Sequence, residues 1–335
     1  MRVVHAVATD SFAGVERYVA DTSAELQRRG WDVLIIGGNA THMRTAAADV
    51  PHEAATTSRE VMRALRAVGA VDVVHAHMTA AELPAALLAR RLRGPLIATR
   101  HFASPRGTSL GGHLVRPFIE RRIARQIAIS EFVAREIGED SVVVPNGVPS
   151  SDLARERTRT VLLLQRLQPE KNTALALEAW RASGLADDGW SLRICGEGVE
   201  GPALQELAHK LGVDTSVTFV GFSTTPRQEM AAAALLLATA PAEPFGLAVV
   251  EAMAMGTPVV AADGGAHPET LGSAGRLFPP GDVTACAAAL RTLADDPTLR
   301  AALGAELRER QRTFFSITAH VDALEKVYAD AMRSS

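Results

Sequence analysis

The sequence predicts an α/β protein with two parallel sheets, each covered by helices on both faces. Short apolar runs typical of buried strands alternate with helical segments along the whole chain, which is the pattern of parallel sheets. The alternation stops at a polar stretch near residue 150 and then restarts. At 335 residues the chain is too long for one ordinary core. It therefore suits two domains of about 150 residues each.

The composition is that of an ordinary water-soluble protein, with 47% hydrophobic residues and 26 glycines. A net charge of -3 argues against a general nucleic-acid binder. The two cysteines, Cys195 and Cys286, lie far apart and form no disulfide framework or zinc-ligand spacing. No segment has the pattern of a secretory signal or a membrane span. We therefore expect a cytoplasmic protein.

The first half of the chain predicts six strands and three helices. The expected strands are 3–8, 33–37, 71–76, 96–99, 126–130 and 142–144, and the expected helices are 15–29, 59–68 and 80–93. Gly14 lies in the turn between the first strand and helix, where a glycine lets a ligand approach the backbone. The turn has no G-x-G-x-x-G sequence, which argues against a dinucleotide-binding dehydrogenase.

Histidines gather where the predicted strands of the first half end. His75 and His77 flank Ala76, so both point to the same side of a strand. A structural role is the preferred interpretation of this pair, and an acceptor pocket and a metal site are the alternatives, although no nearby carboxylate completes a ligand set. His101 directly follows a strand end and is the better functional candidate, with a loop histidine satisfied by its neighbours as its alternative.

A basic segment precedes the domain boundary. Arg116–Arg125 reads as a helical stretch with apolar residues between its arginines. Such a stretch is usually a solvated face, but it could also touch anionic lipid headgroups or a phosphorylated acceptor. A peripheral contact with the inner face of the membrane is therefore a second expectation. We predict domains at 1–149 and 159–315, a linker at 150–158, and a final helix over 316–335 that packs back on the N-terminal domain.

The second half restarts the pattern with five strands, at 161–164, 192–195, 217–220, 235–238 and 259–262. The loop after the first of them carries Arg166 and Lys171, and Lys171 is one of only three lysines in the chain. Two cations at the carboxyl end of a first strand suit a diphosphate. A solvated surface is the alternative for this loop.

The most informative stretch is 241–269. Gly246–Met255 reads as a helix that is apolar all the way round, with Glu251 as its only charge and Glu243 in the loop ahead of it. Free backbone N–H groups and the positive end of the helix dipole lie between the two carboxylates and form an anion site. Acceptors for hydroxyls beside donors for a phosphate match a nucleotide-sugar. The alternative is a buried helix whose glutamate is paired with an arginine.

These residues together resemble the retaining glycosyltransferases of family four. The resemblance rests on four motifs: Glu243-Pro244-Phe245-Gly246 with Glu251, Arg166 with Lys171, Pro145-Asn146-Gly147-Val148, and Gly264-Gly265 with Pro268-Glu269. It covers nearly the whole chain. It implies the GT-B fold, with two facing Rossmann-like domains, a cleft between them and a C-terminal helix that crosses back.

The resemblance also implies roles for individual residues. Arg166 and Lys171 would hold the donor diphosphate, Glu251 would accept from the ribose hydroxyls, and Glu243 would face the transferred sugar. Backbone N–H groups would assist them, from Phe245, Gly246 and Leu247. His101 is similar to the family's pocket histidine, and Gly14 to its first-loop glycine near the diphosphate. The family often has glycine where this chain has Gln165.

The function implied is transfer of a sugar, with retention, from a nucleotide-diphosphate sugar to a hydroxyl acceptor. A UDP-sugar is expected ahead of a GDP-sugar, and a glycolipid, a polysaccharide or a small metabolite would be the acceptor. No D-x-D pair lies beside the phosphate loop and cationic side chains can neutralise the diphosphate, so we expect no metal and no cofactor. Two alternatives are a GT-B sugar-nucleotide epimerase and a non-catalytic nucleotide-sugar-binding partner of another enzyme.

Overall fold

The computed structural model describes residues 1–106, 112–151 and 155–334. The chain divides into an N-terminal unit, Met1–Pro149 with Phe315–Ser335, and a C-terminal unit, Ser150–Phe314. Of the predicted linker at 150–158, residues 152–154 lie outside the described part. Each unit contains one parallel sheet with helices on both faces, so the predicted α/β fold class is confirmed.

The N-terminal unit has a seven-stranded sheet in the order β3-β2-β1-β4-β5-β6-β7, with every described pair of strands parallel. The strands are β1 (Arg2–Val7), β2 (Asp32–Ile36), β3 (His52–Glu53), β4 (Val73–His77), β5 (Leu96–Arg100), β6 (Ile123–Ala128) and β7 (Val142–Val143). The central strands β1, β4 and β5 are buried almost throughout, which explains why they appear in the sequence as continuous apolar runs.

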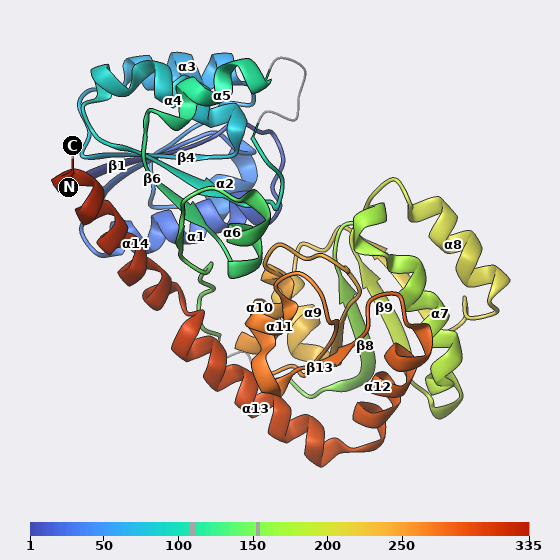
Figure 1. Ribbon diagram of the computed structural model, residues 1–335. Coiled ribbons are helices and arrows are strands. Elements are labelled where there is room, and N and C mark those ends of the chain that lie inside the picture. Colours follow the sequence, from blue (N-terminus) through green and yellow to red (C-terminus); the bar gives the residue numbers. More distant parts are fainter. Residues whose placement is uncertain (107–111, 152–154, 335) are drawn as a thin grey trace. The chain divides into compact units, whose positions relative to one another are not determined.

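Helices cover both faces of this sheet, with α3 and α4 on one face and α1 and α14 on the other (Figure 1). The helices of the unit are α1 (Gly14–Arg28), α2 (Ala40–Ala46), α3 (Ser58–Ala67), α4 (Thr79–Leu92), α5 (Gly112–Glu120), α6 (Glu131–Ile137) and α14 (Ile317–Arg333). Local signals set their ends. Thr57 and Glu60 form a capping box at the start of α3, and Gly138 ends α6 with a φ of 61°.

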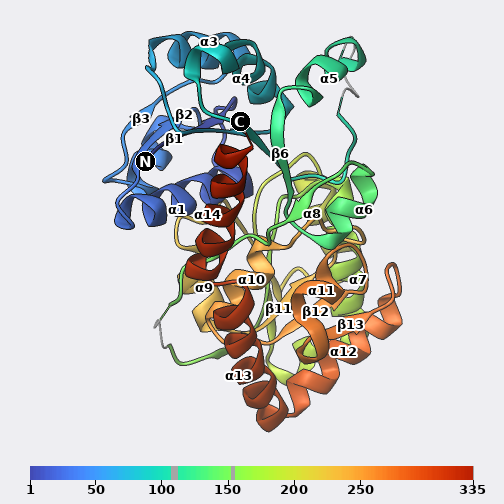
Figure 2. The ribbon, with the colours of Figure 1, turned by 60° about the vertical axis from the view of Figure 1, so that its left-hand side comes forward.

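The final helix α14 belongs to the N-terminal unit, although 165 residues separate it from the rest of that unit. It packs beside α1, as both views of the ribbon show (Figure 2). The Ser316 side chain caps it by accepting from the Ala319 N–H at 3.2 Å. Val321, Leu324 and Tyr328 are fully buried against the sheet. The helix is therefore part of the core of this unit.

The C-terminal unit repeats the same strand order with six strands, β10-β9-β8-β11-β12-β13, again all parallel. The strands are β8 (Thr158–Leu164), β9 (Ser191–Cys195), β10 (Val217–Gly221), β11 (Ala233–Ala238), β12 (Val259–Ala262) and β13 (Arg276–Phe278). The helices are α7 (Thr173–Ser183), α8 (Gly201–Lys210), α9 (Pro226–Ala232), α10 (Leu247–Ala254), α11 (His267–Leu271), α12 (Val283–Asp295) and α13 (Pro297–Phe314). The buried Trp180 lies in the hydrophobic core of this unit.

One predicted element is wrong in its second half. The basic stretch Arg116–Arg125 is helical only as far as Glu120, where α5 ends, and Ile123–Ala128 forms β6. Ile127 packs into the core beneath the sheet, so tertiary packing overrides the helical spacing of the arginines. Within the described part of the chain, no helix combines the length and apolar character needed to cross a membrane.

Candidate functional site

The loops that carry the predicted donor-binding residues meet at one place in the C-terminal sheet. The chain order of the strands reverses between β8 and β11, which are neighbours in the sheet. In open parallel sheets, ligands bind beyond the carboxyl ends of the strands at this switch point. Arg166 and Lys171 lie in the loop after β8, and Glu243 and Gly246 lie in the loop after β11. The fold therefore places both candidate loops at the expected binding edge.

Lys171 and Glu243 form the central contact of this site. Lys171 Nζ lies 2.5 Å from Glu243 Oε2, and each side chain is only 16% exposed. A cation and an anion held this close, and largely removed from water, form a strong and directional pair. Arg166 is placed differently, because its guanidinium pairs with Glu170 at 2.9 Å and both side chains are more than half exposed. The structure thus joins Lys171 to Glu243 and leaves Arg166 at the surface.

Gln165 ties the two loops together, a role that sequence reasoning missed. Its Nε2 lies 3.1 Å from the Lys171 carbonyl oxygen and 3.2 Å from Thr239 Oγ1. Thr239 Oγ1 in turn donates to the Lys171 carbonyl at 2.7 Å. The backbone of Lys171 is therefore fixed from both loops. The signal in the sequence was the glutamine itself, at a position where the resemblance led us to expect a glycine.

The glycine pair after β12 is required by a close backbone approach. A Cβ added to Gly264 would lie 2.0 Å from the Pro241 carbonyl oxygen, and one added to Gly265 would lie 2.3 Å from Glu243 N and O. Neither position has room for a side chain. The next N–H, from Ala266, donates to the Glu243 carbonyl at 2.8 Å. The loop that carries Glu243 is therefore held by main-chain contacts.

The helix α10 follows this loop. Gly246, at its start, has a φ of +86°, a conformation that favours glycine. The N–H groups of the first turn have no partners within the helix and, with the helix dipole, make its start attractive to an anion. Phe245 is buried, and its carbonyl accepts from Thr270 Oγ1 at 3.1 Å. Glu251 is 9% exposed on this helix, among the buried residues that were predicted to surround it.

His267 is a further residue at this site that the sequence did not single out. It is fully buried, and its Nδ1 lies 3.0 Å from the Ala262 carbonyl oxygen, so Nδ1 carries the proton. Nε2 is buried and has no hydrogen-bond partner among the described residues. Burial lowers the pKa of His267, and the charges of Glu243 and Lys171 act on it in opposite directions. The signal that could have found it is its position two residues after Gly265.

In the N-terminal unit, Gly14 begins α1 after the turn that follows β1, and His101 directly follows β5. Gly14 is the exposed first residue of α1. The buried carboxylate of Glu16 accepts from the Ala13 N–H at 2.8 Å, so this helix start already carries an anion of its own. His101 is 6% exposed, and burial lowers its pKa to about 3. It is therefore an uncharged imidazole at neutral pH.

His75 and His77 are fully buried, so neither side chain lines a pocket open to an acceptor. The two ring nitrogens of His75 lie 2.7 Å from Tyr328 Oη and 2.7 Å from Thr99 Oγ1, which fits the structural interpretation. The ring nitrogens of His77 lie 3.0 Å from His5 and 3.2 Å from His101. His5, His75 and His77 also offer nitrogens within 4.8 Å of one another, a spacing compatible with a metal ion. The absence of a metal stays a prediction.

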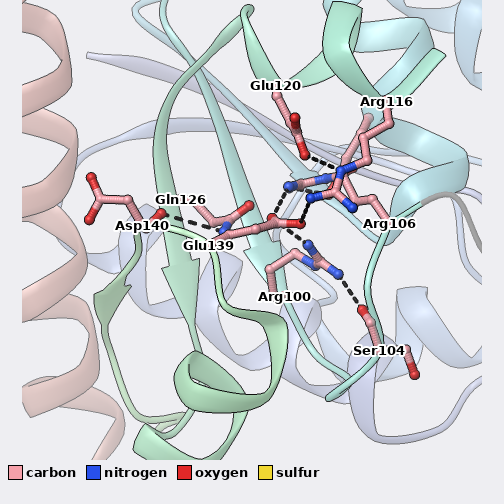
Figure 3. Close-up of polar contacts among 9 residues, drawn as sticks. Arg100, Ser104, Arg106, Arg116, Glu120, Gln126, Glu139 and Asp140 are labelled. Atoms are coloured by element: carbon pink, nitrogen blue, oxygen red, sulfur yellow. Dashed lines mark hydrogen bonds and ion pairs between the residues drawn. The ribbon is translucent and has the colours of Figure 1, made fainter. Parts of the chain in front are cut away.

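A network of ion pairs lies under α5 (Figure 3). Glu139 accepts from Arg100 at 2.8 Å and from Arg106 at 2.5 Å, and its second oxygen lies 3.3 Å from Arg116. Arg106 also forms a two-pronged pair with the fully buried Glu82. A cavity of about 510 Å³ beside the network is lined by residues of both signs. Arg116, the first residue of the predicted basic stretch, is thus engaged in intramolecular pairs.

Comparisons with known proteins identify the family of this chain. The family model described as Glycosyltransferase Family 4 matches residues 12–152, and the model described as Glycosyl transferases group 1 matches residues 149–310. A phosphatidyl-myo-inositol mannosyltransferase of Mycolicibacterium smegmatis is 30% identical, over 89% of this chain and 85% of the relative. A glycogen synthase of Mycobacterium tuberculosis is 31% identical, over 78% and 69%.

Solved structures show the same fold. HepE of Anabaena, determined with UDP and glucose, superposes with a TM-score of 0.85 at 20% identity, covering 98% of this chain and 99% of that one. A sucrose-phosphate synthase of Thermosynechococcus elongatus gives 0.78 at 20% identity over the full length of both chains. The two matched family models, the relatives and the fold lead to one conclusion: this chain belongs to the family 4 glycosyltransferases of the GT-B fold.

Proposed function

We propose that this glycosyltransferase moves a sugar from a UDP-sugar to a hydroxyl acceptor, with retention at the anomeric carbon. The observation that carries the proposal is the Lys171–Glu243 pair at the switch point, next to the start of α10. The presence of UDP and glucose in the HepE structure supports a UDP-sugar as donor. The names of the relatives support acceptors that are lipids or polysaccharides.

The proposed roles follow from the charge that develops during the reaction. Breaking the bond between the sugar and the diphosphate leaves negative charge on the diphosphate and oxocarbenium character on the sugar. Lys171 and Arg166 are the cations that would stabilise the diphosphate, assisted by the N–H groups at the start of α10. Glu243 orients Lys171 and has a second oxygen that can accept from a sugar hydroxyl. Glu251 would accept from the ribose hydroxyls.

Two residues of the N-terminal unit complete the proposed set. His101, neutral and slightly exposed beyond β5, would contact the reacting substrates through its ring. Gly14, exposed at the start of α1, would let a phosphate approach the backbone. We propose that these groups suffice without a metal or a cofactor, since Lys171 and Arg166 would supply the positive charge that neutralises the diphosphate.

We also propose a peripheral contact with the inner face of the membrane through α5. Leu114 is 76% exposed and Phe118 is 36% exposed on this helix. The Arg122 guanidinium lies over the Phe118 ring, 5.3 Å from its centre. Apolar side chains beside arginines suit anionic lipid headgroups. Co-sedimentation with vesicles containing phosphatidylglycerol tests this, and Leu114→Asp with Phe118→Asp should abolish it; equal sedimentation of this variant would contradict the contact.

Substitution of Lys171 tests the proposed donor site. Lys171→Ala should lower kcat at least about a hundredfold, because removing one preorganised donor of this kind costs about 3–4 kcal/mol of barrier. Lys210→Ala is the matched control, since Lys210 is an exposed lysine of the same unit, paired only with its helix neighbour Glu206. Near-normal turnover by the purified Lys171→Ala protein would refute the assignment.

Analysis of the products separates the proposal from its alternatives. Proton NMR of the glycoside should show the anomeric configuration of the donor, and an inverted product would refute retention. Release of an isomerised free donor would indicate an epimerase, and tight donor binding without turnover would indicate a binding module. A screen of nucleotides by thermal shift identifies the base, since a ligand at 100 times its Kd stabilises by about 2.7 kcal/mol.

A further inference from the structure

Three histidine rings form an unbroken hydrogen-bonded chain inside the N-terminal unit. His5 Nδ1 lies 3.0 Å from His77 Nε2, and His77 Nδ1 lies 3.2 Å from His101 Nε2. The rings come from three strands, because His5 is on β1, His77 ends β4 and His101 follows β5. β4 lies between the other two strands in the sheet. The chain therefore runs across the carboxyl ends of adjacent strands, at the switch point of this sheet.

All three rings are uncharged at neutral pH. Burial lowers the pKa of His5 and of His101 to about 3, and lowers that of His77 as well, with neighbouring histidines adding to the effect. A neutral imidazole has one N–H and one bare nitrogen. Each contact between two rings needs one donor and one acceptor. The protons of the three rings must therefore all point the same way along the chain.

The two possible directions of the N–H groups differ at the His5 end of the histidine chain. If the N–H groups point from His5 towards His101, His5 Nε2 is a bare nitrogen. If they point the other way, His5 Nε2 carries a proton. That nitrogen is buried and has no partner within the described residues. Buried N–H groups without an acceptor are rarer in proteins than buried acceptors without a donor. The first direction is therefore the favoured one.

In that direction His101 Nε2 accepts from His77, and the proton of His101 lies on Nδ1. We propose that His77, held by His5, is a positioning residue that locks His101 in this tautomer, so that His101 offers substrates an N–H donor and not a basic nitrogen. Among the described residues the histidine chain ends at His5 without a further partner. The chain therefore serves to orient His101 and not to conduct a proton through the unit. The inference deepens the proposed function, because it rests on the role of His101 given above.

The tautomer can be measured without turnover. In full-length protein with ¹⁵N-labelled histidine, long-range ¹H–¹⁵N correlation spectra distinguish protonated from bare ring nitrogens, and His101→Gln assigns the signal of His101. We expect Nδ1 to be protonated in the unmodified protein. In His77→Leu the donor to Nε2 is lost, and we expect the proton to move to Nε2, the form that free neutral imidazole of histidine favours.

Activity should follow the tautomer. We expect His77→Leu to lower kcat about tenfold or more, with the KM for the donor within about threefold, since a hydrogen bond made in the transition state acts on kcat. His77→Asn places an amide N–H near the former Nδ1 and should restore both the tautomer and at least about a third of kcat. It also tests the proposal if the leucine variant fails to fold.

His75→Leu is the matched control. His75 is equally buried two residues earlier on β4, and its bonds go to Tyr328 and Thr99 and not to His101. We expect it to lower Tm as much as His77→Leu while the tautomer of His101 stays unchanged and kcat stays within about twofold. A proton on Nε2 of His101 in the unmodified protein, or an unchanged tautomer in His77→Leu, would overturn the inference. Failure of the protein to use any nucleotide-sugar would refute the proposed function and leave the tautomer measurement valid.

Discussion

The two units have the same strand order but place different chemistry at its switch point. In the C-terminal unit, β8 and β11 lead into loops that present Lys171 and Glu243 beside a helix start, above an apolar core. In the N-terminal unit, β1 and β4 bury uncharged histidines. Of the ten histidines in the chain, only His209 and His267 belong to the C-terminal unit. Topology therefore selects where a site forms, and the side chains that follow each strand select what the site can do.

Low pH should produce the largest difference in stability between the two units. Five buried histidines of the N-terminal unit have lowered pKa values: His5, His75, His77, His101 and His320. In the unfolded chain each titrates near 6.5. Their contribution to stability is thus complete above pH 6.5 and is lost as the pH falls towards the lower folded values. Below pH 6.5 each histidine lowers the free energy of unfolding by about 1.4 kcal/mol per pH unit, and the five together lower it by about 7 kcal/mol per pH unit. The N-terminal unit should therefore unfold near pH 5.

Tryptophan signals measure this difference. Trp31 lies in the N-terminal unit, and Trp180 and Trp190 lie in the C-terminal unit. During an acid titration followed by NMR, the indole signal of Trp31 should lose its native position first. Loss of all three signals at one pH would show that the units unfold together, and a native Trp31 signal at pH 4 would contradict the cost assigned to the histidines.

Removal of Glu139 should give the next largest effect, also in the N-terminal unit. Glu139→Ala leaves the guanidinium groups of Arg100 and Arg106 without a shared acceptor, and both are almost fully buried. Breaking a buried pair from one side costs about 3–5 kcal/mol. Urea unfolding at neutral pH measures the loss. Glu206→Ala removes one partner of an exposed pair in the C-terminal unit and should leave the urea midpoint unchanged; a similar change in both variants would refute the special role of the Glu139 network.

Glu251→Gln should have a smaller effect, and on binding more than on stability. The substitution keeps the shape of the side chain but removes the proposed charge-assisted bonds to the ribose, which are about twice as strong as neutral ones. We expect the Kd for the donor to rise about tenfold, an effect of about 1.4 kcal/mol, with a smaller change in the stability of the empty protein. Calorimetry and thermal unfolding measure the two quantities. A drop of about 3–5 kcal/mol in stability with unchanged donor binding would show a structural ion pair instead.

Chelation should have the smallest effect of all. With Lys171 and Arg166 as the proposed cations of the donor site, we expect turnover in EDTA to equal turnover without it. Restoration of a lost activity by added magnesium or manganese would instead show that the C-terminal site depends on a metal.

The sequence predicted the architecture because buried strands and helix caps are local signals. The strand 161–164 and the helix 246–255 are both present, as β8 and α10, within a few residues of their predicted ends. Short elements such as α2 and β13 were not predicted, because seven and three residues carry too little periodicity. The segment 121–125 was assigned to a helix because its arginines masked the start of β6.

Contacts between segments far apart in the sequence could not be predicted from local sequence patterns. The motif residues Lys171 and Glu243 could be named from the sequence, but their ion pair depends on the pairing of β8 with β11. The role of His5 was invisible for the same reason, because only the parallel register of β1 and β4 brings its ring to His77. A histidine inside an apolar strand gives no sign of which ring it will meet.

The placement of α14 has a consequence for how the protein is made. Domains usually fold in the order in which a ribosome produces them. Here the C-terminal unit, Ser150–Phe314, is complete in sequence before the residues of α14 have been synthesised. Until then the sheet of the N-terminal unit lacks Tyr328, and His75 lacks one of its two hydrogen-bond partners. We therefore expect the C-terminal unit to reach its native state first. The N-terminal unit would complete its core, and bury its histidines, only after α14 has been synthesised.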